Sequence, residues 1–456
     1  MRVFVLFSAV MAAGLGLSFA AENDVSFQLH GQGWTDRGRI MSSSDRVLGD
    51  GITAYSVDGS PIQSLGGQFT LDASLGEHWS GAFGLGVYQV TQSYGSVGEA
   101  SNYTEWFNTS MWRAYVPQAN LTYYPGGRDN PWLTVTAGTF AYDYNPDVKN
   151  LGLYLLRGPV YPGVLMSGFR EFDTDTSIGT QTGFKIHNAV GNFSHDLLFL
   201  NERVLPPTFD WSLAYVAKYR LFKALEVGAG VNFYRLVPYS TALETPGRLG
   251  GGTASPGSYE VRAPGDTVFY THQGTKLMGM FSLDLKRWIS SGRMSAQDLK
   301  LYGEVAVIGV KDYGSYYNKI QERIPAMAGF NIPTFGILDV LSIEGEWYGS
   351  HYRNDLANLG YPRSIVAPWQ DPGFGTPSPV PVSPGTYADS VADNIKWSVF
   401  AQKTVARHIQ FTLQVANDHY RPNQLGTAFV NAVGGTQAVL TAKKDWYMMG
   451  RIGFSF

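Results

Sequence analysis

Hydrophobic and polar residues alternate with a period of two in many short segments of this chain. Near position 345, for example, apolar Ile343 and Trp347 alternate with polar Ser342, Glu344 and Glu346. Successive side chains of a β-strand point to opposite faces, so each such segment predicts a strand with one apolar and one polar face. About sixteen strands of this kind follow one another along the chain, and the count is even.

The last strand reaches the final residue of the sequence. Its apolar face includes Trp446, Ile452, Phe454 and Phe456, and the alternate positions are mostly polar or small. One face suits lipid and the other a wet interior. The segment resembles the C-terminal assembly signal of bacterial outer-membrane proteins, in which a terminal Phe closes an alternating strand. The resemblance implies that the outer-membrane assembly machinery recognises these four residues.

The connections between the predicted strands alternate in length. Short connections near 76–78, 188–192 and 405–407 are separated by long ones such as 36–65, 142–178 and 349–393. A transmembrane barrel has this layout because its periplasmic turns are short and its extracellular loops are long. The fold class predicted is therefore all-β, a transmembrane antiparallel up-and-down β-barrel of about sixteen strands. Seven Pro between 361 and 385 make 349–393 a Pro-rich extracellular loop.

The first residues have the pattern of a secretory signal peptide. Arg2 precedes an apolar run, and Ser18-Phe19-Ala20 places small residues at −3 and −1 of a cleavage site after Ala20. We expect residues 1–20 to be removed on export, leaving 21–456 as one barrel domain. The expected location is the outer membrane of a Gram-negative cell, in contact with outer-membrane lipid and lipopolysaccharide.

The amino-acid composition excludes several classes of function. Charged residues are 16% of the chain, the formal net charge is −3 and there is no Cys. This balance does not suit a nucleic-acid binder, and disulfides, Cys-ligated metals and thiol catalysis are excluded. The eight His show no metal-ligand spacing and no Gly-x-Ser-x-Gly occurs. The sequence predicts no metal, no cofactor and no enzymatic activity.

Strand pattern and loop layout resemble those of general bacterial porins over the whole mature chain. The resemblance implies a sixteen-stranded outer-membrane channel, a homotrimer, and a third long loop that folds into the barrel. Here that loop is 142–178, and the apolar Val148, Leu151 and Leu155 suit burial in the lumen better than exposure to water. Residues 147–156 are predicted to form a short helix. The alternative places the loop over the barrel mouth. Candidate constriction residues are the charged side chains of the loop: Asp143, Asp147, Lys149, Arg157, Arg170, Glu171, Asp173 and Asp175.

The predicted inner face carries charges of both signs. Candidate lumen-facing residues are Lys218, Arg220, Glu226, Lys276, Asp284, Lys300, Glu304, Glu344, Glu346 and Arg451. Rings of one sign would make a channel selective, whereas a mixture whose members pair across the wall predicts weak charge selectivity.

Three functions are compatible with these patterns. The first is passive diffusion of small hydrophilic solutes through an outer-membrane channel. The second is a substrate-specific channel, for example for carbohydrates, with inward Tyr and Trp as a stacking track. The third is a secreted, soluble β-rich polysaccharide-binding protein. Passive diffusion is the function we expect.

Overall fold

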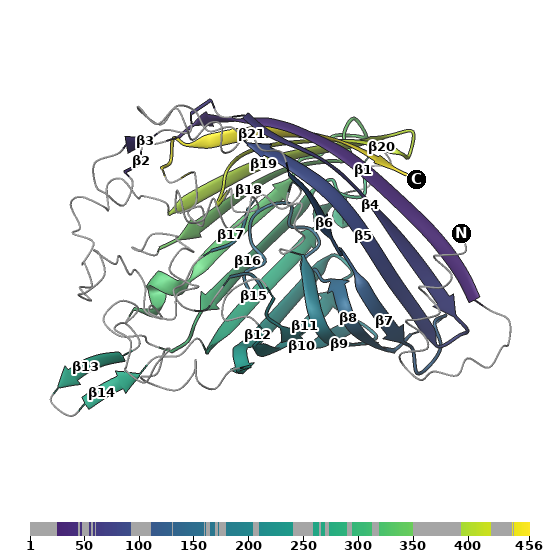
Figure 1. Cartoon of the computed structure of the whole chain (residues 1–456), viewed down its shortest axis with the longest axis horizontal. Helices are drawn as coiled ribbons and strands as arrows, with labels where there is room; N and C mark the ends of the chain where they lie inside the picture. Colours follow the sequence, from purple (N-terminus) through teal and green to yellow (C-terminus); the bar gives the residue numbers. More distant parts are fainter. Residues whose placement is uncertain are drawn as a thin grey trace.

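The computed structural model of the chain is a barrel formed by one large β-sheet (Figure 1). Its description covers residues 25–456 except for 44–45, 48–53, 56–57, 60, 93–110, 130, 159, 161–164, 169–171, 173–178, 204–208, 240–258, 264–265, 270–272, 290–293, 312–318, 350–393, 421–439 and 441. The wall strands are β1 (Val25–Ser42), β4 (Pro61–Leu75), β5 (Trp79–Gln92), β6 (Met111–Tyr115), β7 (Ala119–Tyr123), β8 (Leu133–Ala141), β9 (Thr180–Val190), β10 (Phe193–Asn201), β11 (Trp211–Leu221), β12 (Leu225–Val237), β15 (Gly274–Asp284), β16 (Lys300–Ile308), β17 (Pro325–Asn331), β18 (Val340–Tyr348), β19 (Ile395–Val405), β20 (Ile409–Asn417) and β21 (Trp446–Ser455).

The sheet has seventeen strand segments, but two of them belong to one wall strand. Both β6 and β7 pair with β5 in antiparallel register, and Val116-Pro117-Gln118 separates them. Pro117 has no backbone N–H to donate, so the ladder is interrupted there. The wall therefore contains sixteen strands, which confirms the predicted number.

The barrel closes because the last strand pairs with the first. The register of β21 on β1 runs from Gln32 opposite Ser455 to Ser42 opposite Trp446, with an irregularity after Ile40. β1 also pairs with β4, from Val25 opposite Leu75 to Arg39 opposite Pro61. Closure pairs both edges of the described wall sheet, which removes the aggregation hazard of an exposed edge strand.

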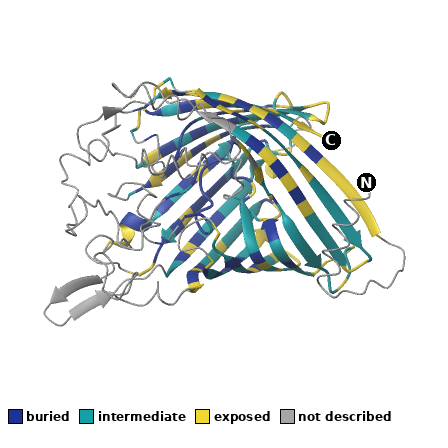
Figure 2. Cartoon of the chain, viewed as in Figure 1, coloured by how far each residue is buried: buried dark blue, intermediate teal, exposed yellow. Residues whose placement is uncertain are grey.

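Wall strands have one inward and one outward face, and Figure 2 shows alternating bands of burial along several of them, such as β18. In β18, Ser342, Glu344 and Glu346 are buried, whereas Ile343 and Trp347 are each 47% exposed. The exposed apolar side chains form the outer surface, and the buried polar ones face the interior. The prediction of an all-β barrel with an apolar outer face is confirmed.

Most predicted connections agree closely with the strand ends, but the first long loop was predicted too long. The sequence pattern placed a loop at 36–65, whereas β1 continues to Ser42 and β4 begins at Pro61. The outward positions of this stretch include Arg37 and Gln63, which interrupt the apolar pattern that marks a membrane strand. The ladder with β4 and β21 holds these residues in strand conformation.

Short elements outside the wall complete the fold. β13 (Tyr259–Ala263) and β14 (Asp266–Phe269) form a hairpin between β12 and β15, and β2 (Arg46–Val47) pairs with β3 (Ala54–Tyr55). The 3-10 helices η1 (Leu285–Trp288) and η2 (Ile320–Arg323) have one turn each. No helix in the described part of the chain is long and apolar enough to cross a membrane.

Candidate functional site: the loop inside the barrel

The loop between β8 and β9 lies against the inward face of the wall. Its apolar residues Val148, Leu151 and Leu155 are each at most 1% exposed. They belong to one buried cluster with inward-facing wall residues, among them Leu198, Ala214, Val216, Met278, Met280, Tyr302, Ala306 and Met327. The apolar side of the loop is thus buried against the barrel wall and not exposed to water.

Two wall carboxylates bind the backbone of this loop. Glu344 accepts hydrogen bonds from the backbone N–H groups of Lys149 (2.5 Å), Asn150 (2.8 Å) and Leu151 (2.8 Å). Glu304, on β16, accepts them from Leu153 (3.0 Å) and other loop donors. Each carboxylate accepts several backbone N–H groups at once and therefore anchors the loop to the wall.

The helix predicted for 147–156 is wrong. The segment consists of turns and bends, and Gly152 and Leu153 have positive φ values of 86° and 60°. A side chain at 152 would be strained by that backbone and would approach Met327 at 3.1 Å. The backbone N–H groups that a helix would use internally are given to Glu344 and Glu304, so the wall satisfies them instead.

Tyrosine hydroxyls of the loop bind the same wall carboxylates. Tyr144 donates to Glu304 at 2.7 Å, and Tyr154 donates to Glu346 at 2.8 Å. Burial, and next the neighbouring glutamates, raise the pKa of both tyrosines well above the usual range. Both hydroxyls therefore keep their protons and remain donors at any physiological pH.

A buried wall lysine binds the carbonyl side of the loop. Lys276 Nζ donates to the carbonyl oxygens of Arg157 (2.8 Å) and Gly158 (2.7 Å), and Asn232 Nδ2 donates to that of Leu155 (3.0 Å). Wall acids thus bind loop N–H groups, and wall amines and amides bind loop carbonyls. This division satisfies the polar backbone of a segment that has no secondary structure of its own.

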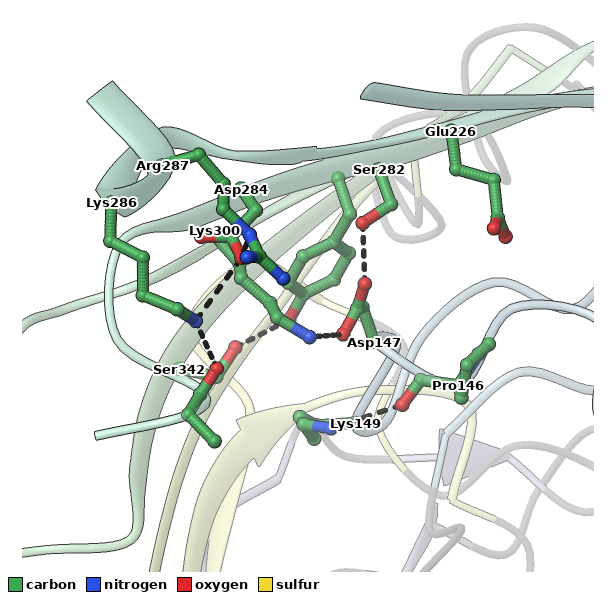
Figure 3. Close-up of polar contacts among 12 residues, drawn as sticks. Pro146, Asp147, Lys149, Glu226, Ser282, Asp284, Lys286, Arg287, Lys300 and Ser342 are labelled. Atoms are coloured by element: carbon green, nitrogen blue, oxygen red, sulfur yellow. Dashed lines mark hydrogen bonds and ion pairs between the residues drawn. The ribbon is translucent and has the colours of Figure 1, made fainter. Parts of the chain in front are cut away.

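Asp147 is tied to the wall by side-chain contacts that Figure 3 shows. Its carboxylate accepts a hydrogen bond from Ser282 and forms an ion pair with Lys300 at 2.5 Å. Burial alone would raise the pKa of Asp147, but the hydrogen bonds from Lys300 and Ser282 outweigh it and lower that pKa below its ordinary value. Asp147 is therefore an anchor held in its charged form.

The distal part of the loop reaches other strands. Ser167 Oγ donates to Glu346 at 2.8 Å, and the same carboxylate contacts His419 Nε2 at 2.7 Å. Phe172 is buried among residues of β1, β4 and β21, and its ring centre lies 5.2 Å from the Arg451 guanidinium. The described loop residues therefore contact the wall from β10 to β18 and again at the β1–β21 seam.

The other charged loop residues predicted at the constriction differ in how far they are buried and in what they contact. Asp143 is half-buried and accepts the N–H of Asn145 at 2.9 Å, and Lys149 Nζ donates to the Pro146 carbonyl at 3.1 Å. Arg157 is only 6% exposed. Arg170, Glu171, Asp173 and Asp175 lie outside the described residues, as does nearly all of 349–393.

The remaining lumen-facing candidates form pairs on the inward face, largely near the short turns. Glu226 lies 3.7 Å from Lys218 and 3.2 Å from Arg220. Asp284 contacts Lys286 and Arg287, each at 3.3 Å. Opposite charges close to each other cancel most of their field at a distance.

The residues of the C-terminal strand lie where the alternating pattern put them. Trp446, Ile452, Phe454 and Phe456 share the outward face, and Tyr447 and Met449 on the other face are buried. Phe456 exchanges two backbone hydrogen bonds with Gly31, both 2.9 Å, and its ring meets Phe69 edge-on. The terminal residue thus completes the seam of the barrel.

Several residues of the site were not identified from the sequence. Asn150 donates to Asp418 at 2.7 Å, Tyr447 donates to the same carboxylate at 2.7 Å, and His419 contacts Glu346. Asp418 and His419 follow β20 directly, a position the pattern marked only as a strand end. Among the described residues no group of three His, Cys, Asp or Glu is arranged to hold a metal ion.

The chain is a closed antiparallel β-barrel: sixteen strands form the wall, and a long loop is packed against its inner face. No protein-family model and no curated protein sequence matches it. Solved structures with a similar fold include a triple mutant of the Rhodopseudomonas blastica porin, at 8% identity, TM-score 0.42 and coverage of 94% of this chain and 100% of that one. OmpF of Salmonella typhi in complex with daunomycin has 10% identity, TM-score 0.42 and coverage of 94% and 97%. Both TM-scores are below 0.5, so we assign the barrel fold from the strand pairings of this chain alone.

Proposed function

We propose that the protein is an outer-membrane channel through which small hydrophilic solutes diffuse passively. The observation that carries this proposal is the loop bound to the inward face of the wall by Glu304, Glu344 and Lys276. A loop held against the inner wall of a barrel narrows the path that the lumen offers to solutes. Because it is anchored through its backbone, the narrowed section has a defined shape.

Charge pairing supports weak ion selectivity. Asp147 pairs with Lys300, and Glu226 pairs with Lys218 and Arg220. Selectivity filters of charged channels use rings of one sign, whereas these inward charges are of both signs and contact each other. Candidates for lining the narrowest section are the loop charges predicted above, of which Asp143 and Lys149 are half-buried.

A substrate-specific carbohydrate channel is less well supported. Such a channel needs aromatic rings open to the lumen, on which sugars stack. The inward rings of Trp34, Tyr88, Tyr302 and Tyr447 are at most 7% exposed, since neighbouring side chains cover them. These aromatics stabilise the wall and the loop, and they leave little ring surface for a passing sugar.

Location and assembly follow from the same proposal. We infer that residues 1–20 are cleaved on export, that the long loops face outward from the cell, and that the barrel is surrounded by outer-membrane lipid. A homotrimer is the assembly that the porin resemblance implies. Cross-linking of the protein in native outer membranes, with gel analysis of the products, tests the trimer.

Conductance in planar bilayers tests the channel proposal. Deletion of residues 148–158, joined by two Gly, should raise single-channel conductance because the described anchors and the segment between them are removed. Deletion of 244–254, in the connection between β12 and β15, is the matched control and should leave conductance near that of the parent. A parent protein that forms no channel, or a 148–158 deletion with parental conductance and selectivity, would contradict the proposal.

A further inference from the structure

Two arginines lie on the outward face of β1. Asp36 faces inward, where it pairs with Arg451, so Arg37 and Arg39 face outward. Arg37 is opposite Gly450 on one side and Gln63 on the other, and Arg39 is opposite Met448. Both arginine side chains are exposed.

Charges on this face are rare. Among the wall-strand side chains that the structure describes, the other outward cation is Lys403, which contacts Asp339 at 3.4 Å beside a short turn. An Arg facing lipid near the bilayer centre costs roughly 2–4 kcal/mol, and less near the headgroups. Arg37 and Arg39 therefore need a polar or anionic environment outside the barrel.

The position of Arg37 and Arg39 along the barrel axis indicates that they lie near the lipid headgroups. Phe456, at the end of the outward aromatic face, is hydrogen-bonded to Gly31, and Arg39 lies eight residues further along β1. Eight residues span about 26 Å of strand, or about 19 Å across the membrane at a tilt near 45°. An outer-membrane apolar band is about 25 Å tall, so Arg39 lies close to its extracellular edge. Arg37 lies one strand repeat below, within reach of that edge because a long Arg side chain extends toward water.

Two exposed lysines lie beyond the same end of β1. Lys443 and Lys444 immediately precede Asp445 and β21, whose first residue Trp446 is opposite Ser42 at the extracellular end of β1. Arg39 Nε also donates to the carbonyl of Gly59 at 2.9 Å, which draws its side chain toward the extracellular connection. Arg37, Arg39, Lys443 and Lys444 together are called the basic patch.

No carboxylate of the described wall strands lies on the outward face beside the basic patch, and Asp58, which precedes the Gly59 that binds Arg39, accepts the backbone N–H of Ser43. Every Asp and Glu of the described wall strands lies at an inward register position, and Asp445, next to the two lysines, is buried and accepts the N–H of Ala442 at 2.8 Å. A second copy packed wall against wall would present apolar side chains to the arginines. Charge complementarity therefore favours an anionic headgroup over a second copy of the chain.

We propose that the basic patch binds the phosphate groups of an acylated, phosphorylated glycolipid in the outer leaflet, the chemistry of the lipid A part of lipopolysaccharide. A guanidinium donates two parallel hydrogen bonds to a phosphate, and the acyl chains lie along the apolar face beside it. Met448 and Ile452 supply that face next to β1. The proposal rests on the outer-membrane location and not on conduction.

Binding of purified lipid A tests the proposal. Diphosphoryl lipid A is titrated into the folded, detergent-solubilised full chain and bound lipid is counted by native mass spectrometry; lipid A without phosphates, phosphatidylcholine and millimolar inorganic phosphate serve as comparators. The Arg37→Gln/Arg39→Gln variant should weaken diphosphoryl lipid A binding about 10- to 30-fold, since each basic residue near an anionic lipid surface contributes about 1 kcal/mol. Lys223→Gln/Arg407→Gln removes two exposed cations from the short turns and should bind as the parent does. Lys443→Gln/Lys444→Gln, which leaves the strands intact, should weaken binding to a smaller extent.

The outcomes separate the alternatives. Loss of binding in the arginine variant but not in the turn variant supports the proposal, provided that both variants keep the heat-modifiable gel migration of a folded barrel. Equal binding by parent and arginine variant overturns it, as does equal binding of phosphate-free lipid A. A change of oligomeric state in the arginine variant, with lipid binding unchanged, would assign the patch to an interface between copies. Displacement by inorganic phosphate alone would show recognition of free phosphate and overturn the lipid assignment.

Discussion

Asp36 and Arg451 form a two-pronged ion pair across the seam that closes the barrel. Arg451 Nε lies 2.6 Å from Asp36 Oδ1, and Nη2 lies 2.7 Å from Oδ2. The two residues are 415 positions apart in the sequence and directly opposite each other in the strand register. The Trp34 ring lies beside the same guanidinium, 5.4 Å from its centre. The first and last strands are therefore joined by side chains as well as by their ladder.

Removal of this pair should weaken closure. Asp36→Asn leaves Arg451 with a neutral partner in a largely buried position, and loss of one member of such a pair costs about 3 kcal/mol. The variant should unfold at lower temperature, measured as the shift from folded to unfolded migration on gels after heating in detergent. Asp72→Asn is the control, since Asp72 pairs with His30 at a site where both side chains are about half exposed. An equal decrease in unfolding temperature in the two variants would show that the Asp36–Arg451 pair stabilises the barrel no more than an exposed pair does.

The terminal residue should be essential for assembly. Phe456→Asp places a charge where the ring meets Phe69 and the backbone closes on Gly31. We expect strongly reduced protein in the outer membrane, measured by immunoblot of membrane fractions. Phe222→Asp changes a ring that is 84% exposed in a short turn and should assemble normally. Normal levels of the Phe456 variant would refute the role given to the terminal strand.

The two faces of the wall should tolerate a charge differently. Ile343→Arg, on the outward face at the middle of β18, should cost about 2–4 kcal/mol. Thr70→Arg, on the inward face of β4 and half-buried, should cost much less and change conductance. Denaturant titration of the folded proteins in lipid vesicles measures both. Similar costs at the two positions would contradict the assignment of the faces.

Glu344 should control how firmly the loop is held. Glu344→Gln removes the charge that binds three consecutive N–H groups, and its amide N–H₂ cannot accept them. Loss of charge-assisted bonds at a buried site costs about 2–4 kcal/mol. Single-channel recordings should show more current noise than in the parent. Glu226→Gln, on the inward face near a short turn, is the control, and equal noise there would rule out the anchoring role.

Acid should release the Asp147 anchor. The pKa of Asp147 is lowered in the folded protein, so its ion pair stabilises the loop above the unfolded value near 4 and is lost as pH falls through the lower folded value. Asp147→Asn should therefore be noisier than the parent at neutral pH, and the difference should persist at pH 4 and vanish only when the pH falls below the lowered pKa of Asp147. Asp143→Asn, the same change four residues earlier, provides the comparison. A difference between parent and Asp147→Asn that does not depend on pH would show that the anchor is not electrostatic.

Local sequence was sufficient for most of the wall. The period-two pattern located Ile343, Trp347 and Ile452 on the outward face because the lipid-facing side of a strand must be apolar whatever lies beside it. The exception was the stretch around Arg37, where outward charged residues interrupt the alternation of apolar and polar positions. That stretch was interpreted as loop, although pairing with two neighbouring strands makes it part of the wall.

The sequence by itself determined the fold class, the number of strands, the alternation of short and long connections, and the polarity of each face, because each depends on neighbours within a few residues. The tertiary structure alone decided the partners inside the barrel. Glu344 meets the backbone of Asn150 and Asp36 meets Arg451 only because closure and register bring together residues separated by 194 and 415 positions. The conformation of 147–156 was decided in the same way: its local pattern favours a helix, but wall carboxylates bind its N–H groups and stabilise an irregular loop instead.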